Sequence, residues 1–264
     1  MNPKISGVPA FVLAVAALLM LTPGPFADAG RALPLQDTLP KAEQILDQYV
    51  TAIGGLAALE KVNNRVIKGT LEIAGAGIKL AIAVYQARPN KAYTVLDSAA
   101  TGKIETGTNG EVAWQLSAMA GPQVLEGEER VNFLHLNIFD RLAYWRTSFK
   151  KVETSGAEDV SGKPCYKVTA TPAGLPPQTL YFDKESHLLL RAEMTVVNQA
   201  GTFASDTYLS DYRPVNGITL AHRTVTKLMG QERITTMESV EQNVELPADR
   251  FDLPAEIKAL IKKD

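Results

Sequence analysis

The sequence predicts an α+β fold: a single curved antiparallel sheet that stays open as a half-barrel, with helices packed on its concave face. From Arg65 onward, short segments of alternating apolar and polar residues are separated by turn residues, a pattern typical of a meandering antiparallel sheet. Two helical patterns, at residues 38–62 and 126–145, carry apolar stripes that must cover an apolar surface. Turns recur at roughly 8–12 residues, which predicts about nine to eleven strands.

The first residues have the pattern of a secretory signal. Lys4 supplies a positive charge, residues 10–21 form an unbroken apolar run, and Ala27-Asp28-Ala29 offers a small-residue cleavage site. The run is shorter than the roughly 20 residues that span a bilayer, and an uncleaved anchor is the alternative. We expect residues 1–29 to be removed on export to the periplasm, residues 30–39 to form a linker, and residues 40–264 to form one domain.

The composition excludes several classes of protein. Cys165 is the only cysteine, so the chain can form no internal disulfide and has no cysteine after the signal that could be lipidated. The formal net charge is −2, and no basic stripe is present that would bind nucleic acid. We therefore expect a soluble periplasmic protein that binds no nucleic acid.

A helical segment opens the predicted domain. Asp37 or Thr38 can cap it, and Ile45, Tyr49 and Ile53 recur at four-residue spacing. Gly54-Gly55 should end this helix, and residues 56–62 should form a short second helical piece.

The spacing of apolar residues then changes from that of a helix to that of strands. Ile67 and Leu71 alternate with polar residues, and Leu80 and Ile82 alternate with polar or small ones. Later in the chain, Asn216-Gly217 is a strong signal for a two-residue hairpin turn. These patterns predict hairpin after hairpin up to about residue 240.

One segment interrupts the strands. In residues 126–145, the residues Leu134, Ile138, Leu142 and Trp145 share a stripe at helical spacing. We expect one long amphipathic helix here, and a short helix at residues 254–262 at the end of the chain.

The sequence contains no recognisable catalytic or metal-binding motif. His135, His187 and His222 have no partner ligand at metal-binding spacing, and no nucleophile elbow or phosphate-binding loop is present. A hydrolase that uses Ser117, Ser148 or His135 is the remaining enzymatic alternative. We expect a protein that is not an enzyme and needs no cofactor or metal.

An ordered series of short motifs carries a resemblance to a known family. The series consists of Ala52-Ile53-Gly54-Gly55-Leu56, Gly69, Tyr181-Phe182-Asp183, Asp211-Tyr212-Arg213-Pro214-Val215-Asn216-Gly217-Ile218, Asn243, Phe251 and Pro254. In order and spacing it resembles the bacterial outer-membrane lipoprotein-sorting superfamily, related to the LolA carrier and the LolB receptor, over roughly residues 38–261. The resemblance implies an unclosed half-barrel with an apolar lining and a helical lid.

The same resemblance implies carriage of a lipid or of the acyl chains of a lipoprotein in the periplasm, without a cofactor. The chain is longer than the carriers, no arginine can be matched to the one that closes their lid, and the lipidated cysteine of a receptor is missing. The alternative is an interaction module with a filled core that binds envelope membrane proteins. For the carrier, we expect the apolar lining to be Ile67, Leu71, Leu80, Ile82, Trp114, Leu134, Ile138, Leu142 and Trp145.

Overall fold

The computed structural model describes residues 39–98, 102–198 and 201–262. These residues all belong to one compact unit, Leu39–Asp264. The signal expected at residues 1–29 and all but the last residue of the linker expected at 30–39 lie outside the described residues. No helix within the described ranges is both long and apolar enough to cross a membrane.

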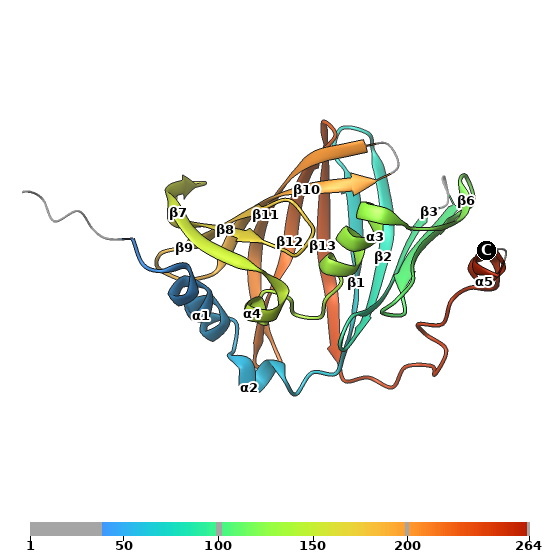
Figure 1. The fold of residues 1–264 in the computed structure, drawn as a ribbon, viewed down its shortest axis with the longest axis horizontal. Helices are drawn as coiled ribbons and strands as arrows, with labels where there is room; N and C mark the ends of the chain where they lie inside the picture. The colour runs from blue at the N-terminus through green and yellow to red at the C-terminus, as the bar shows by residue number, and fades with distance from the viewer. Residues whose placement is uncertain (1–38, 99–101, 199–200, 263–264) are drawn as a thin grey trace, which may run out of the picture. The chain divides into compact units, whose positions relative to one another are not determined.

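A single antiparallel sheet of thirteen strands forms the body of this unit (Figure 1). Its strands are β1 Asn64–Ile73, β2 Ile78–Ala87, β3 Lys91–Ser98, β4 Gly102–Thr108, β5 Ala113–Ser117, β6 Gly121–Val124, β7 Lys151–Val160, β8 Lys163–Thr171, β9 Gln178–Asp183, β10 Leu189–Asn198, β11 Gly201–Val215, β12 Ile218–Leu228 and β13 Gln231–Gln242. The open half-barrel is therefore confirmed. The expected nine to eleven strands were too few, because short strands such as β6, which contains Gly121 and Pro122, read as turns in the sequence.

The order of the strands places the two ends of the sheet-forming chain in the middle of the sheet. The spatial order is β6-β5-β4-β3-β2-β1-β13-β12-β11-β10-β9-β8-β7. The chain runs outward from β1 to one edge, crosses to the opposite edge through the helical segment after β6, and returns to pair β13 with β1. Ile67 on β1 lies opposite Val240 on β13. The crossing segment consequently spans the concave face (Figure 1).

Helix α1 (Ala42–Ala52) and helix α2 (Leu56–Leu59) meet at a glycine that the packing requires. Gly54 has φ +121°, and a Cβ atom there would lie 2.3 Å from the carbonyl oxygen of Gly217 in the β11–β12 turn. In that turn, Asn216 (φ +49°) and Gly217 (φ +83°) both adopt positive φ, as a two-residue hairpin turn requires. Both the helix break and the hairpin are thus confirmed.

The long helix expected at residues 126–145 is wrong in part. The chain forms α3 (Gly127–Leu136), a non-helical connection, and α4 (Trp145–Ser148). Asn137 caps α3 by donating its side-chain amide to the carbonyl of Phe133 (2.8 Å). Asp140 then adopts φ +50°, a left-handed conformation that Asp tolerates better than most residues. Ion pairs of Asp140 with Arg65 and Arg88 stabilise this break between the helices.

The hollow of the half-barrel is filled on one side. Ile45 and Leu46 of α1 pack with Leu180 and Phe182 of β9 in the main core, and Trp145 of α4 belongs to the same cluster. Each of these side chains is almost completely buried. The region where α1 and α4 cover β8–β10 is therefore an ordinary packed core.

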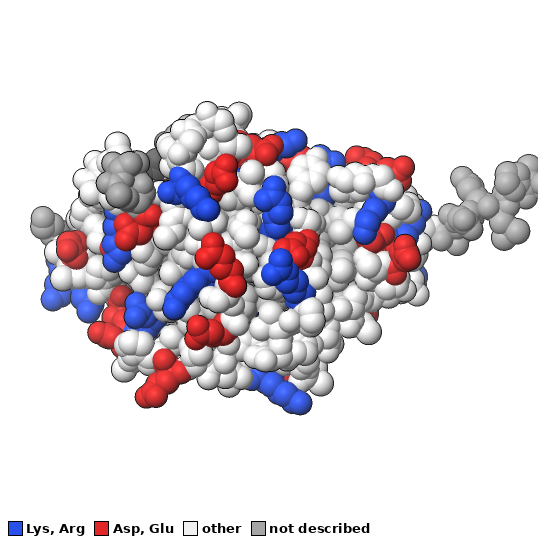
Figure 2. Space-filling view, turned by 180° about the vertical axis from the view of Figure 1, so that it is seen from behind, with Lys and Arg blue, Asp and Glu red and all other residues white. Residues whose placement is uncertain are grey.

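The last segment of the chain covers part of the outer face. Helix α5 (Ala255–Ile261) confirms the expected C-terminal helix and buries Ile257 completely. Asn243 anchors this segment: its side-chain oxygen accepts from the backbone N–H of Asn63 (2.7 Å), and its side-chain amide donates to the carbonyl of Lys61 (2.8 Å). Seen from behind, acidic and basic side chains are interspersed over the molecule (Figure 2).

Candidate functional site

A cavity of about 400 Å³ lies between the helical segments and the concave face of the sheet. Its walls come from α1, α2, the end of α3, the α3–α4 connection and strands β1, β2, β11, β12 and β13. Most of the lining is apolar: Ile53, Leu59, Ile67, Val84, Leu136, Ile138, Leu142, Ala143, Leu209, Ile218, Leu220, Ala221 and Met237. Its volume lies within the range of about 300–1,000 Å³ common for small-molecule pockets. This cavity is the candidate binding site.

The structure distributes the nine expected lining residues over several places. Ile67, Ile138 and Leu142 line the cavity. The pairings of β1 with β2 put Leu71, Leu80 and Ile82 on the same face as Ile67, further toward the β1–β2 turn and outside the cavity lining. Leu134 is half-buried on α3. Trp145 belongs to the packed core, where its indole N–H donates to Asp47 Oδ1 (3.1 Å).

Trp114 corrects the expected lining, because it lies on the outer face of the sheet. Its ring stacks 6.0 Å from the ring of Tyr93, and the guanidinium of Arg250, from the C-terminal segment, lies 5.6 Å from Tyr93. A Cβ atom at Gly107 would approach the Trp114 ring to 2.7 Å, so this position must be glycine. Trp114 is therefore buried on the outer face, next to Tyr93, and not in the cavity.

A cluster of charges holds the α3–α4 connection to the sheet beside the cavity. Asp140 accepts a hydrogen bond from Arg65 (3.1 Å), and its second oxygen lies 3.6 Å from Arg88. The side chains of Arg65 and Asp140 are only 7% and 9% exposed. Both guanidinium groups also lie over the ring of Phe139, at 5.0 and 4.8 Å from its centroid. The connection is thus fastened by one carboxylate between two arginines.

Arg141, the next residue, also lines the cavity but has no acidic partner among the described residues. Its Nη1 donates to Gln178 Oε1 (3.1 Å) and to His135 Nε2 (3.2 Å), both of them neutral acceptors. Burial lowers the pKa of Arg141 to about 10. An arginine in this environment stays protonated at neutral pH, so it brings an uncompensated positive charge to the cavity wall.

Two neighbours of Arg141 are held in their neutral forms. Burial, with the Arg141 charge as a second cause, lowers the pKa of His135 to about 4. Because Arg141 always donates, His135 Nε2 must accept, which places the proton of the ring on Nδ1. Burial, together with the Asp140 carboxylate, raises the pKa of Tyr49 to about 12. Tyr49 lines the cavity, and its hydroxyl has no hydrogen-bond partner in the described part of the chain.

Sequence reasoning missed these polar groups. At helical spacing, Arg141 falls on the polar side of the long helix expected at residues 126–145, and Tyr49 belongs to the apolar spacing of the first helix. The useful signal was Asp140-Arg141, a charged pair between the apolar residues Phe139 and Leu142. That position can be read as part of the site only once the break in the helix is known.

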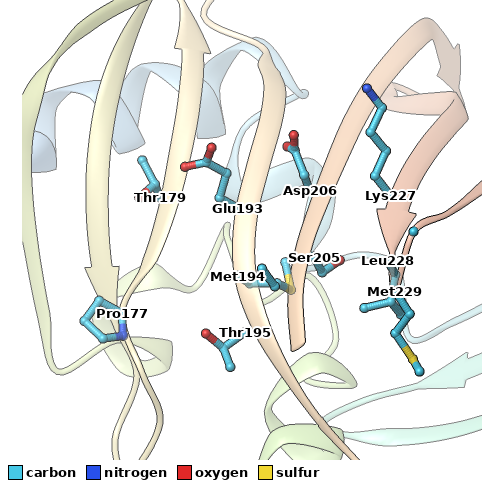
Figure 3. Close-up of a pocket in the computed structure, with 12 residues that line it drawn as sticks. Pro177, Thr179, Glu193, Met194, Thr195, Ser205, Asp206, Lys227, Leu228 and Met229 are labelled. Carbon is cyan, nitrogen blue, oxygen red and sulfur yellow. The ribbon is translucent and has the colours of Figure 1, made fainter. Parts of the chain in front are cut away.

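Two other hollows lie along the sheet, and both have several charged side chains in their walls. One, of about 560 Å³, is formed at β9–β12 and includes Glu193, Asp206 and Lys227 in its wall (Figure 3). The carboxylates of Glu193 and Asp206 are ion-paired with Arg191. Another, of about 720 Å³, carries Lys163, Asp211 and Glu232. No helix lines either hollow.

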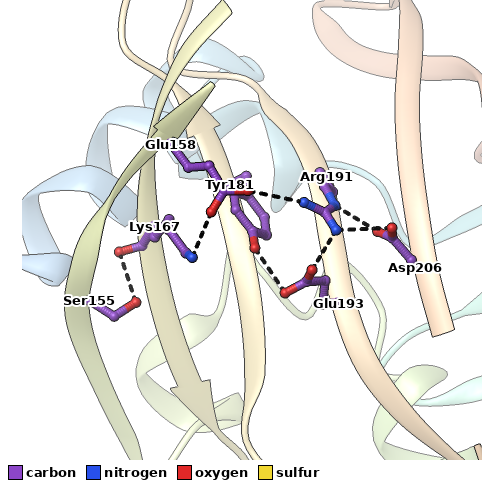
Figure 4. Close-up of polar contacts among 7 residues, drawn as sticks. All are labelled: Ser155, Glu158, Lys167, Tyr181, Arg191, Glu193 and Asp206. Carbon is purple, nitrogen blue, oxygen red and sulfur yellow. Dashed lines mark hydrogen bonds and ion pairs between the residues drawn. The ribbon is translucent and has the colours of Figure 1, made fainter. Parts of the chain in front are cut away.

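The ion pairs of the outer face form a connected network across β7–β11 (Figure 4). Arg191 pairs with Asp206 (2.8 Å), Glu193 (2.5 Å) and Glu158 (3.4 Å), and Lys167 pairs with Glu158 (2.8 Å). Within the described ranges, no three His, Cys, Asp or Glu side chains are grouped so as to hold a metal ion. The network is a cross-strand ladder of two cations and three carboxylates on a solvated face.

No protein-family model matches the sequence, and no curated protein matches it. Solved structures do share its fold. A DUF1329 family protein from Desulfovibrio piger superposes with a TM-score of 0.59 at 14% identity, over 81% of this chain and 98% of that chain. A LolA superfamily protein from Nitrosomonas europaea superposes with a TM-score of 0.56 at 12% identity, over 81% of this chain and 99% of that chain.

A third similar structure is a domain from Vibrio parahaemolyticus described as a candidate outer membrane lipoprotein-sorting protein. It gives a TM-score of 0.59 at 12% identity, over 84% of this chain and 99% of that chain. At such identities the likeness concerns the fold and not the activity. The chain therefore has a LolA-like fold, the open half-barrel found in outer membrane lipoprotein-sorting domains.

Proposed function

We propose that the protein is a non-enzymatic periplasmic carrier that binds a lipid, or the acyl chains of a lipoprotein, in the cavity beside Ile138 and Leu142. The observation that carries this proposal is the cavity itself: an apolar space of about 400 Å³ under a helical lid in a LolA-like fold. The signal pattern at residues 1–29 supports export.

The energetics of the cavity suit a ligand that must be released. Burying an acyl chain gains roughly 0.8 kcal/mol per methylene. The lid is fastened by Asp140 between Arg65 and Arg88, so opening it for a long chain costs part of that gain. Such a lid lowers the net affinity, because binding retains only the free energy gained by burying the acyl chain minus the cost of opening the lid.

The filled part of the hollow favours a second candidate. Ile45, Leu46, Phe182 and Trp145 leave β8–β10 covered by the protein's own side chains. If the space beside Ile138 also closes in solution, the protein is an interaction module that contacts envelope membrane proteins through its outer surface.

Two measurements separate these candidates. Mass spectrometry of lipids extracted from natively purified protein should find a copurifying amphiphile if the protein is a carrier. Ile138→Glu should then weaken uptake of a fluorescent fatty acid by roughly 10-fold or more, because an unpaired charge in an apolar site costs several kcal/mol. The matched control is Val131→Glu, at a 37% exposed apolar position on α3, which should leave uptake unchanged.

Thermal unfolding of both variants distinguishes lost binding from lost folding. A wild-type protein that yields no lipid and takes up no fatty acid or lipopeptide would contradict the carrier and favour the interaction module. Equal losses for Ile138→Glu and Val131→Glu would show that the cavity is not the binding site.

A further inference from the structure

Arg141 places a positive charge in a wall that is otherwise mostly apolar. The other charged groups in the lining are Arg65 and Asp140, and these two pair with each other. A charge removed from water without an opposite partner is costly. The charge of Arg141 is therefore either a burden on the fold or one half of a pair that a ligand completes.

The donors of Arg141 leave room for a ligand. Arg141 Nη1 donates to Gln178 and His135. Among the described residues, Arg141 Nε and Nη2 have no hydrogen-bond partner. Two adjacent N–H groups of a guanidinium form the fork that binds a carboxylate or a phosphate with two parallel hydrogen bonds.

Tyr49 supplies another donor at the same cavity. Its raised pKa keeps the hydroxyl protonated at neutral pH, and that hydroxyl is unused within the described ranges. The charge of Arg141 acts on the Tyr49 hydroxyl, opposing the rise in its pKa. Two other donors in the lining are partly or fully engaged: Arg65 pairs with Asp140 through Nη2, although its Nε has no partner in the described part of the chain, and Tyr212 donates to the carbonyl of Leu189.

We infer that the amphiphile bound in this cavity carries an anionic oxygen group, a carboxylate or a phosphate, which pairs with the free edge of Arg141 and accepts from the Tyr49 hydroxyl. The acyl chain then lies along Ile67, Ile138 and Leu142. This inference rests on the proposed carrier function and names the class of its ligand: single-chain anionic amphiphiles ahead of neutral ones.

Isothermal titration at pH 8 with three ligands of equal chain length tests the inference: a fatty acid, the corresponding alkyl phosphate and the corresponding fatty alcohol. The wild type should bind both anions at least 10-fold more tightly than the alcohol, which corresponds to about 1.4 kcal/mol. Of the two anions, the tighter binder identifies the source as a free fatty acid or as a phosphate-bearing lipid.

Substitutions assign the preference to its residues. Arg141→Gln should remove the preference for anions while leaving the affinity for the alcohol within about 3-fold. Arg141→Lys should keep part of it, since a point charge without the fork remains. Tyr49→Phe should reduce it by a smaller factor. Arg213→Gln, on an exposed arginine outside the cavity, is the matched control and should change nothing.

The outcomes distinguish the inference from the function on which it rests. If the wild type binds the alcohol as tightly as the anions, the anionic group is refuted and the carrier stands. If Arg141→Gln keeps the full preference for anions, the assignment to Arg141 is refuted. If none of the three ligands binds to folded wild-type protein, both the inference and the proposed function fail.

Discussion

The arginines on the two sides of the sheet have opposite electrostatic environments. On the outer face, Arg191 is surrounded by the carboxylates of Glu158, Glu193 and Asp206, and its pKa is raised, chiefly by its hydrogen bonds with Asp206. On the concave face, Arg141 has only neutral acceptors among the described residues, and burial lowers its pKa. The outer face shows that acidic side chains can be arranged around an arginine in this fold. Among the described residues no acidic side chain pairs with Arg141, and this points to a ligand as its partner.

The largest effect is expected from breaking the charge cluster next to Arg141. Asp140→Asn keeps a residue that tolerates φ +50° but removes the carboxylate that pairs with both Arg65 and Arg88. Removing one partner of a buried pair typically costs 3–5 kcal/mol, so we expect the free energy of unfolding to fall by about that amount. Chemical denaturation measures it. A loss below about 1 kcal/mol would mean that the α3–α4 connection is not held by this cluster.

A smaller loss is expected on the outer face. Arg191→Leu leaves Glu158, Glu193 and Asp206 without the cation they share. Hydrogen bonds to charged groups each contribute about 1.5 kcal/mol or more, but solvent screens this face. We expect a loss of about 1.5 kcal/mol in the free energy of unfolding, reduced at high salt. Arg213→Leu, which breaks only the exposed pair with Asp211, should cause no measurable loss.

The elements predicted from sequence are those that local residues determine. The break at Gly54-Gly55 and the turn at Asn216-Gly217 follow from residues that adopt positive φ readily. The alternation around Ile67 predicted strands because a strand exposes every second side chain to the same face. The overall half-barrel could be predicted because these local signals agree along the whole chain.

The features that the sequence did not predict depend on distant contacts. The helix expected at residues 126–145 is interrupted at Asp140 by Arg65, 75 positions earlier in the chain. Trp114 was assigned to the cavity because its alternation fits either face of the sheet, and Arg250 of the distant C-terminal segment lies on that outer face. Neither contact can be inferred from the neighbouring residues in the sequence. The spacing of apolar residues alone therefore could not place Arg141 at a cavity.

The pH dependence of stability should report on the neutral acceptor of Arg141. Burial lowers the pKa of His135 from 6.5 to about 4, so between these values the unfolded chain binds a proton that the folded protein does not. Stability contributed by the neutral ring should therefore be lost as the pH falls from about 6.5 toward 4. We expect a change on the order of 1 kcal/mol, because the ring is half-buried and solvent screens it.

Denaturation profiles of the wild type and His135→Gln at several pH values measure this change. Glutamine keeps an acceptor for Arg141 but does not titrate, so the variant should show a flatter profile between pH 6.5 and 4. Identical slopes for the two proteins would place the titrating group elsewhere.

The smallest change in stability should come from the residue that matters most for the proposed ligand. Arg141→Leu removes a charge that no acid compensates, and replacing buried charges by apolar groups is often neutral or stabilising. Without Arg141, the Gln178 side-chain amide can donate to His135 Nε2, which already lies 3.5 Å from Gln178 Nε2. We expect the free energy of unfolding without ligand to stay the same or to rise by up to about 1 kcal/mol. A fall of more than about 2 kcal/mol would show that Arg141 stabilises the fold, and its lack of an acidic partner would then no longer argue for an anionic ligand.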